Sequence, residues 1–228
     1  MLIKKVALVA ALLSSVAVQA DTAPSYRYLQ GSVEHISQSG EESLSDTGFG
    51  AKAAWQFNNN WFIGAKWQRF SDSESYAENF NSEQLIVSLE LTLDRYYLGG
   101  GYIMPISDVT NLSFAGYLGS YRLSADGRVQ VFSNGQPTFT ESYSESDSSE
   151  SLKIETVLRS NINSKLELSG TAYYEYLNAD LDNKSQYGLG VGAQYHFSEN
   201  FALTSDLSYG KVLDENTTQL SVGARYNF

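Results

Sequence analysis

Residues 186–197 have the sequence QYGLGVGAQYHF, in which two kinds of side chain alternate strictly. The odd positions are all apolar or aromatic, whereas the even positions are all glycine or polar. Successive side chains of a β-strand point to opposite faces, so the pattern predicts a strand with one apolar face and one small or polar face. Residues 48–57 and 166–176 repeat the same alternation.

Alternating strands are also found in secreted β-sandwiches, but two features favour a transmembrane β-barrel. Aromatic residues flank the apolar faces at the strand ends, as they do at the two membrane interfaces. The connections also alternate between short turns and long polar loops, which is typical of periplasmic turns and extracellular loops. The expected turns are 58–60, 105–108, 161–164 and 198–200, and the expected loops are 37–47, 71–83, 125–150, 178–184 and 214–216. Four turns and five loops predict an all-β, antiparallel, up-and-down barrel of ten strands.

The region from Leu85 to Tyr102 does not fit a single regular strand. Apolar residues occupy the odd positions from Leu85 to Leu93, but the even positions from Tyr96 to Tyr102. This change of phase near Asp94 predicts a β-bulge in one long strand. A hairpin there would change the strand count, so eight or twelve strands stay open as alternatives.

Residues 1–20 are expected to be a cleaved signal peptide. Lys4 and Lys5 form a short basic region, an apolar run follows, and Ala20 is the kind of small residue that precedes signal cleavage. The run is shorter than the roughly 20 residues that a transmembrane helix needs. We therefore expect residues 21–228 to form the mature outer-membrane barrel.

The composition excludes several kinds of site and partner. The chain has no cysteine, which excludes disulfides and zinc–thiolate sites, and its mean hydropathy is −0.28, as expected when lipid-facing and lumen-facing residues alternate. Losing the two signal-peptide lysines takes the net charge from −11 to −13. Such a surface repels nucleic acid, so no nucleic-acid partner is expected.

The C-terminal segment has the pattern of a last barrel strand. Its alternate apolar positions are Leu220, Val222, Ala224, Tyr226 and Phe228. We expect these residues to act as the C-terminal signal for barrel assembly.

Three segments resemble the OmpA-like family of small Gram-negative outer-membrane β-barrel proteins. They are residues 26–33 (YRYLQGSV), 99–107 (GGGYIMPIS) and 222–228 (VGARYNF). The resemblance implies an outer-membrane location amid lipid and lipopolysaccharide. It also implies insertion by the outer-membrane assembly machinery after escort by periplasmic chaperones. The chain resembles the barrel part of the family only, with no peptidoglycan-binding domain expected.

The phase of alternation assigns a set of charged side chains to the lumen. These candidates are Lys52, Lys66, Lys153, Glu155, Arg159, Glu167, Glu175, Asp206 and Arg225. They could line a water-filled pore, or they could fill and close a narrow barrel with ion pairs. Because eight strands are just filled by side chains, ten strands favour the filled lumen.

Two weaker patterns concern the extracellular side. His35 lies beside Glu34 and a loop with serines and acids, so a hydrolase at the barrel rim using His35 is a third hypothesis. The run 141–150, ESYSESDSSE, predicts a solvated loop, with weak divalent-cation binding as an alternative. No catalytic residue, resident metal or cofactor is expected.

Three functions follow, in order of preference. The first is a non-enzymatic structural or surface-interaction role through acidic extracellular loops, with the extracellular ligand unknown. The second is a small passive pore with a preference for cations. The third is the rim hydrolase.

Overall fold

The computed structural model describes residues 23–39, 45–80, 83–133, 135–178, 184–212 and 215–228. Ten strands form a closed antiparallel barrel in which neighbours in sequence are neighbours in space. The strands are β1 (Tyr28–Ser39), β2 (Ser45–Gln56), β3 (Trp61–Phe80), β4 (Glu83–Ser107), β5 (Thr110–Ser133), β6 (Gln136–Asn161), β7 (Leu166–Asn178), β8 (Lys184–His196), β9 (Phe201–Val212) and β10 (Glu215–Asn227). The expected up-and-down barrel of ten strands is confirmed, and the signal peptide expected at 1–20 lies outside the described residues.

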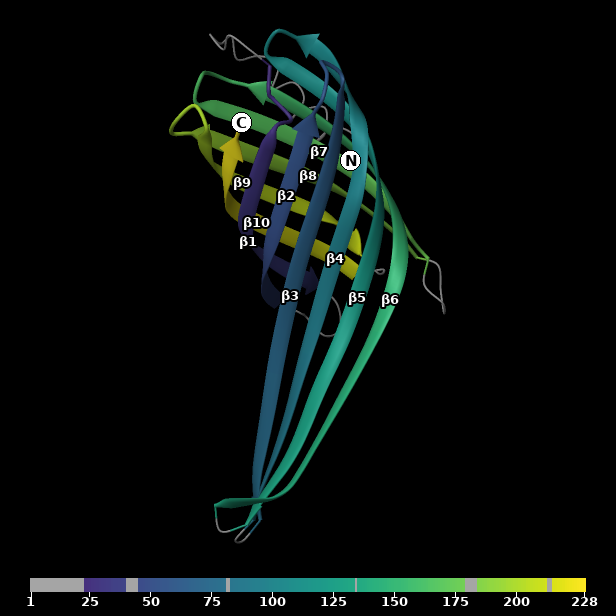
Figure 1. Ribbon diagram of the computed structural model, residues 1–228, viewed down its shortest axis with the longest axis vertical. Helices are drawn as coiled ribbons and strands as arrows, with labels where there is room; N and C mark the ends of the chain where they lie inside the picture. Colours follow the sequence, from purple (N-terminus) through teal and green to yellow (C-terminus); the bar gives the residue numbers. More distant parts are fainter. Residues whose placement is uncertain (1–22, 40–44, 81–82, 134, 179–183, 213–214) are drawn as a thin grey trace.

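The barrel closes between its first and last strands. β1 pairs with β10 from Tyr28 opposite Asn227 to Ser39 opposite Asn216. The four short turns follow β2, β4, β6 and β8, as expected, and the start of β1 and the end of β10 lie at that same end of the barrel (Figure 1). The opposite end, with the longer hairpins, is therefore the extracellular end. Within the described ranges, no helix is long and apolar enough to cross a membrane.

The β3–β6 strands are about twice as long as the others and project from the extracellular end as one arm (Figure 1). The arm begins at a continuous row of paired residues, Phe70–Leu93–Leu123–Asp147. Beyond that row, β3 pairs only with β4 and β6 pairs only with β5. The segments 71–80 and 125–150 were expected to be loops, and that expectation is wrong: apart from the hairpin tip, they are strand. The tip contains Gly135, whose φ of +77° favours glycine.

The expected bulge near Asp94 is also wrong. The register of β4 with both β3 and β5 runs without interruption through Asp94 and Arg95, and its one shift lies between Pro105 and Ser107. The pairing of the strand is regular there, and its apolar side chains change sides instead. In the barrel, apolar residues face out toward lipid, whereas in the arm they lie on the side continuous with the lumen. The change of phase therefore marks the place where β4 leaves the membrane.

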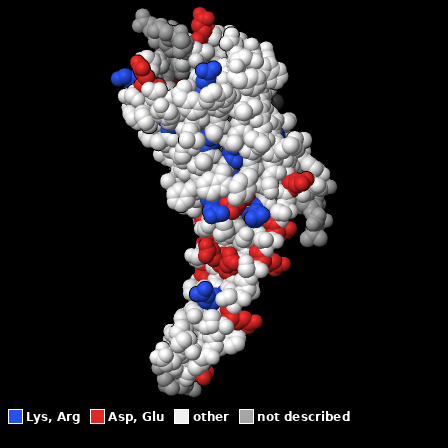
Figure 2. Space-filling view, in the orientation of Figure 1, with Lys and Arg blue, Asp and Glu red and all other residues white. Residues whose placement is uncertain are grey.

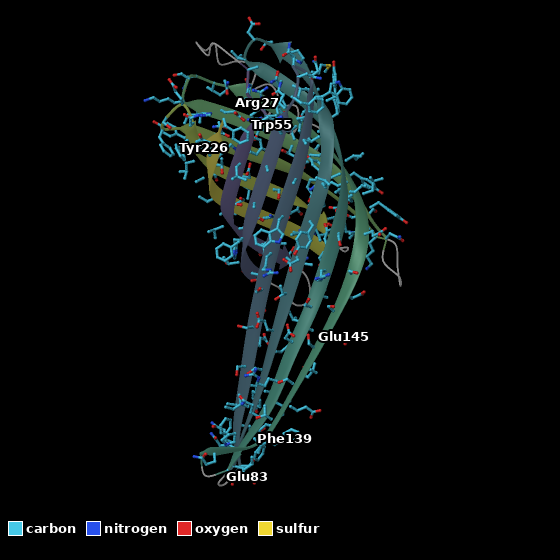
Figure 3. The ribbon with its side chains drawn as sticks, in the orientation of Figure 1. Arg27, Trp55, Glu83, Phe139, Glu145 and Tyr226 are labelled. Atoms are coloured by element: carbon cyan, nitrogen blue, oxygen red, sulfur yellow. The ribbon has the colours of Figure 1, made fainter. Side chains whose placement is uncertain are left out.

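Aromatic side chains form a belt on the outside of the barrel at its periplasmic end. Trp55 packs against Phe228, Trp61 against Tyr102, and Phe201 against Tyr226. Figure 3 shows Trp55 and Tyr226 at the end opposite the arm. On β9 the outward positions run from Phe201 to Tyr209, about 27 Å of strand, so aromatic residues bound the apolar face at both ends.

Candidate functional site

The middle of the lumen holds ion pairs, two of which join strands that are not neighbours in the barrel. Lys66 Nζ of β3 lies 2.7 and 2.8 Å from the two carboxylate oxygens of Glu155 on β6. Lys153 Nζ lies 3.8 Å from the same carboxylate, and Lys52 Nζ lies 3.4 Å from Asp206 Oδ2. Tyrosine rings pack against these lysines, with Lys66 Nζ 4.5 Å from the centre of the Tyr117 ring. These contacts occupy part of the centre of the barrel, and the same side chains line the cavity that lies there.

The periplasmic mouth of the lumen is closed by the segment that precedes β1. Tyr26 is 95% shielded from solvent, stacks on Phe62 with the ring centres 4.6 Å apart, and donates a hydrogen bond of 2.9 Å to Ser113 Oγ. The Arg159 guanidinium lies over the Tyr26 ring, 4.6 Å from the ring centre, and donates a hydrogen bond of 2.9 Å to the Ser25 carbonyl oxygen. Glu167 fixes Arg159 through two hydrogen bonds of 2.6 and 2.9 Å. Tyr26 is therefore held as a plug from three directions.

The extracellular half of the lumen holds a second polar cluster. Glu175 is almost fully buried and accepts hydrogen bonds from Tyr121 at 3.0 Å and Tyr97 at 3.3 Å. The Arg95 guanidinium lies 5.1 Å from the centre of the Tyr121 ring.

At the periplasmic side, Arg225 donates to Gln30 Oε1 at 2.7 and 2.9 Å. The structure thus places all nine charged candidates from the sequence on the lumen side.

Glu34 is a lumen residue that the alternation pattern could have found, because it has the same phase as Gln30 on β1. It has no solvent exposure and accepts hydrogen bonds from Ser32 Oγ at 3.0 Å, Gln68 Nε2 at 2.5 Å and Gln219 Nε2 at 2.8 Å. Its partners are neutral side chains from three strands. Glu34 therefore joins β1, β3 and β10 where the barrel closes.

The ion pairs and tyrosines leave a lumen cavity of about 210 Å³. Charged residues from several strands line it, among them Lys52, Lys153, Glu155 and Arg225. The cavity is large enough for several water molecules. In the part of the chain that the structure describes, no group of three or more His, Asp or Glu side chains could hold a metal ion.

His35 and Glu34 do not form the acid–base pair that a rim hydrolase would use. Neighbouring residues of a strand face opposite sides, so His35 points outward whereas Glu34 points into the lumen. The His35 ring nitrogens instead lie 3.2 Å from Thr47 Oγ1 and 3.3 Å from Ser45 Oγ, all at exposed positions. Glu34 therefore cannot orient the imidazole of His35.

The last strand presents its alternate apolar residues to the outside of the barrel. Leu220, Val222, Ala224, Tyr226 and Phe228 are all exposed in the isolated chain. The same strand pairs with both β1 and β9, so these residues lie at the seam of the barrel.

The arm outside the barrel has two different faces. The face continuous with the lumen carries Leu85, Val87, Leu89, Leu91 and Leu93 from β4, and these residues pair directly with Val131, Val129, Gly127, Ala125 and Leu123 of β5. The other face is rich in serine and threonine, including Ser71, Ser73 and Ser75 on β3 and Ser142, Ser144, Ser146 and Ser148 on β6. Acidic side chains are frequent along the arm, as Figure 2 shows.

A closed ten-stranded barrel with an aromatic-bounded apolar exterior and an ion-paired lumen defines a small outer-membrane β-barrel protein. The model of the outer membrane protein β-barrel domain family matches residues 6–228, and the chain belongs to this family. The resemblance to small OmpA-like barrels is confirmed at this level, as is the outer membrane of a Gram-negative bacterium as the location of such barrels. No curated protein sequence matches the chain.

Several solved structures are similar to this chain. The outer membrane protease OmpT from Escherichia coli has a TM-score of 0.53 and 12% identity, over 89% of this chain and 94% of that one. The attachment invasion locus protein Ail of Yersinia pestis, solved with the heparin analogue sucrose octasulfate, has a TM-score of 0.41 and 16% identity, over 88% and 97%. The translocator domain of the autotransporter NalP from Neisseria meningitidis has a TM-score of 0.46 and 13% identity, over 99% and 94%. At 12% identity, the likeness to OmpT is one of fold alone.

Proposed function

We propose that this protein is a non-enzymatic outer-membrane barrel that presents its arm as a surface for interaction with other molecules. The observation that carries the proposal is the arm itself, a four-stranded sheet that leaves the membrane and exposes an apolar face to water. Monomeric soluble proteins rarely expose large contiguous apolar patches to water, and such patches mark interaction sites. The ion pairs across the lumen support the same proposal, because they narrow any passage and fit a barrel that serves as an anchor.

Two further parts of the proposal concern biogenesis. We propose that a signal peptide at residues 1–20 directs export, and that Leu220, Val222, Ala224, Tyr226 and Phe228 present the last strand to the assembly machinery after escort by periplasmic chaperones. The outward, exposed positions of these five side chains support recognition of the strand before the barrel closes. Once inserted, the same side chains face lipid.

The experiment that tests the main proposal removes the arm and leaves the barrel. Residues 71–92 and 124–146 are each replaced by Asn-Gly, a pair that forms two-residue hairpin turns. The cuts fall at one level, because Phe70, Leu93, Leu123 and Asp147 form one paired row across the four strands. We expect the trimmed protein to reach the outer membrane and keep the heat-modifiable gel mobility of a folded barrel.

The functional readout compares bacteria that produce the intact protein, the trimmed protein or neither. We expect the intact protein to increase retention of the bacteria on cell monolayers, and the trimmed protein to reduce it to the level without the protein. Retention that is equal with the intact and trimmed proteins would overturn the proposal.

A passive pore is the second candidate, and the lumen cavity of about 210 Å³ is the observation that favours it. Several buried polar atoms in the lumen, including Gln30 Nε2 and Gln186 Nε2, have no protein partner and would be satisfied by water. Single-channel recording of the refolded protein in a planar bilayer separates the two functions. Discrete conductance steps that change their cation preference in a Glu155→Gln variant would place the pore first.

A further inference from the structure

The apolar face of the arm forms a continuous strip on its two central strands. Residues directly opposite each other in an antiparallel pair lie on the same face of the sheet. The five β4 residues from Leu85 to Leu93 and their β5 partners from Leu123 to Val131 therefore make one surface. A Cβ atom at Gly127 would overlap the Tyr143 ring, so this glycine lets a β6 ring lie across the strip.

Among the residues that the structure describes, each strand of the arm contacts only its neighbours in the sheet, and the side chain that crosses the strip is the Tyr143 ring of the same sheet. Leu91 is 42% exposed and Leu123 is 52% exposed. At the far end, Tyr76, Phe80, Phe139 and Tyr143 are each at least half exposed. Figure 3 shows Phe139 near the tip of the arm, far from the membrane-spanning barrel.

A row of carboxylates borders the strip on each side. On β3, Asp72, Glu74 and Glu78 are opposite Leu91, Leu89 and Leu85. On β6, Glu141, Glu145 and Asp147 are opposite Val129, Ala125 and Leu123. By this register all six acids share the apolar face, and none of the described arm residues of that face beyond Phe70 and Leu93 is Lys or Arg.

Edge protection explains only part of this arrangement. β3 and β6 are unpaired on one side along the arm, and inward-pointing charges on edge strands prevent strands of other molecules from adding to them. That role requires acids at the edges, but it does not require leucines and valines between them. A sheet with both faces in water would be as stable with polar residues on both faces, as the serine-rich face illustrates.

We propose that the apolar strip and its two acidic rows bind a cationic amphipathic helix of another polypeptide, an inference that rests on the proposed surface-interaction function and identifies the partner. The strip is about 27 Å long from Leu85 to Leu93, which matches about 18 residues of helix. The acidic rows lie about 14 Å apart, three strand spacings, and a helix 10–12 Å wide fits between them. Basic residues on both sides of the apolar face of such a helix would meet both rows.

Charge also selects against the other occupants of an exposed apolar face. A second copy of this chain would bring acidic rows against acidic rows, and lipopolysaccharide would bring its phosphates against them. An added β-strand would meet only one of the two rows. Acids on both sides of the strip therefore favour a single basic helix lying along it.

The test measures binding of a labelled 18-residue peptide of leucine and lysine, designed as an amphipathic helix, to the full-length protein in phosphatidylcholine nanodiscs. Empty nanodiscs correct for binding of the peptide to lipid, and a peptide with glutamate in place of lysine is the probe control. We expect binding that weakens with salt and a gain of helical circular dichroism by the peptide. The glutamate peptide should not bind.

Two sets of substitutions identify the face. Neutralising four acids, Asp72→Asn, Glu74→Gln, Glu145→Gln and Asp147→Asn, should weaken binding by about tenfold or more, and Leu89→Ser with Leu91→Ser should do the same. The matched control changes the opposite face, with Ile86→Ser, Glu90→Gln and Asp126→Asn, and should alter affinity less than about twofold. Gel mobility before and after heating shows that each variant is folded.

The binding measurements would overturn the proposal if affinity fell equally in the control variant, if it were unchanged after the four acids are neutralised, or if the bound peptide had β conformation. Concentration-dependent dimerisation that is lost with Leu89→Ser and Leu91→Ser would assign the strip to a second copy instead. If bacteria that produce the acid or leucine variants are still retained on cells while bacteria that produce the trimmed protein are not, this inference fails and the proposed function stands. If the trimmed protein is also retained, both fail.

Discussion

Tyr26 shows how a single side chain can occupy the periplasmic mouth of a barrel. It comes from the segment before β1, yet its ring contacts Phe62 on β3 and its hydroxyl contacts Ser113 on β5. Arg159 stacks over it from β6 and is itself held by Glu167. A lone buried arginine would carry a large desolvation penalty. The bidentate contact with the Glu167 carboxylate is therefore what allows Arg159 to lie against Tyr26 at this position.

The first prediction is that Tyr26→Ala opens the periplasmic mouth of the lumen. Removing the ring leaves a gap between Phe62 and Arg159, and water enters it because Arg159 and Ser113 are polar. Single-channel recording of the intact protein should show no steps, and the alanine variant should show small, discrete ones. Tyr26→Phe is the matched control, because it keeps the stacked ring, loses only the Ser113 hydrogen bond and should stay closed.

A result in which the intact protein and the alanine variant conduct equally would mean that Tyr26 is not the barrier. The passage for ions would then bypass the N-terminal segment, and the pore would become the leading function.

At the scale of a single element, β4 shows that one regular strand can serve two environments. Its backbone register is continuous through the change. In the arm, from Leu85 to Leu93, the apolar residues lie on the side continuous with the lumen, whereas in the barrel, from Tyr96 to Tyr102, they face outward. Asp94, at the change, faces outward and is held by Arg69 at 2.7 and 2.8 Å and by Trp67 Nε1 at 3.2 Å. Charged and aromatic groups of this kind are typical of a membrane interface.

The second prediction places the membrane boundary on β4 with two substitutions on the same face of the strand. Leu98 is 68% exposed, lies between the aromatic ends of the barrel and faces lipid. Leu98→Arg should lower the free energy of unfolding in lipid vesicles by about 2–4 kcal/mol, the cost of arginine at lipid-facing barrel positions near the midplane. Ile86→Arg, on the outward face of the arm, should change it by less than about 0.5 kcal/mol because that face is in water.

The measurement is urea unfolding followed by tryptophan fluorescence, in vesicles of one lipid composition. Equal costs at the two positions would contradict a boundary at Asp94 and would put the base of the arm inside the membrane.

Strand alternation predicted the barrel well and the arm badly, for a physical reason. In the barrel each strand separates lipid from lumen, so its own sequence alternates, and ten strands with their four turns were predictable. In the arm the apolar face is supplied by β4 and β5, whereas the edge strands β3 and β6 carry acids on it. Their sequences between Ser71 and Glu78 and between Glu141 and Glu150 are therefore polar at nearly every position, which predicts loops.

The lumen was predictable only in part. Phase alone assigned Lys66, Glu155 and Arg159 to the inside, where the structure places them. Which lysine meets which carboxylate depends on contacts across the barrel, and sequence spacing does not encode these. The plug by Tyr26 was not predictable either, because residues before the first strand have no alternation to follow.

For the whole molecule, the structure joins two parts of unequal stability through continuous strands. In the barrel every strand is paired on both sides and lies in lipid, so opening it exposes many backbone groups at once. In the arm the sheet has two free edges and one uncovered apolar face. Local opening should therefore be far easier in the arm, even though β3–β6 run through both parts.

The third prediction is a steep step in amide hydrogen exchange within one strand. Along β6, residues 150–161 pair with both β5 and β7, whereas residues 136–149 pair with β5 alone. Mass spectrometry of peptides from the protein in nanodiscs should show exchange at 136–149 faster by about 100-fold or more than at 150–161. β3 should show the same step after Phe70, the last residue that pairs with β2.

Uniform protection along β6 would contradict this expectation and would mean that the arm opens only together with the barrel. Protein with the trimmed arm supplies the control, because its remaining barrel amides should exchange as slowly as those of the intact protein. If they do, the membrane barrel is stable without the arm. The leucines and valines of the arm then contribute little to holding the barrel together, and binding at their exposed face remains the reason for keeping them there.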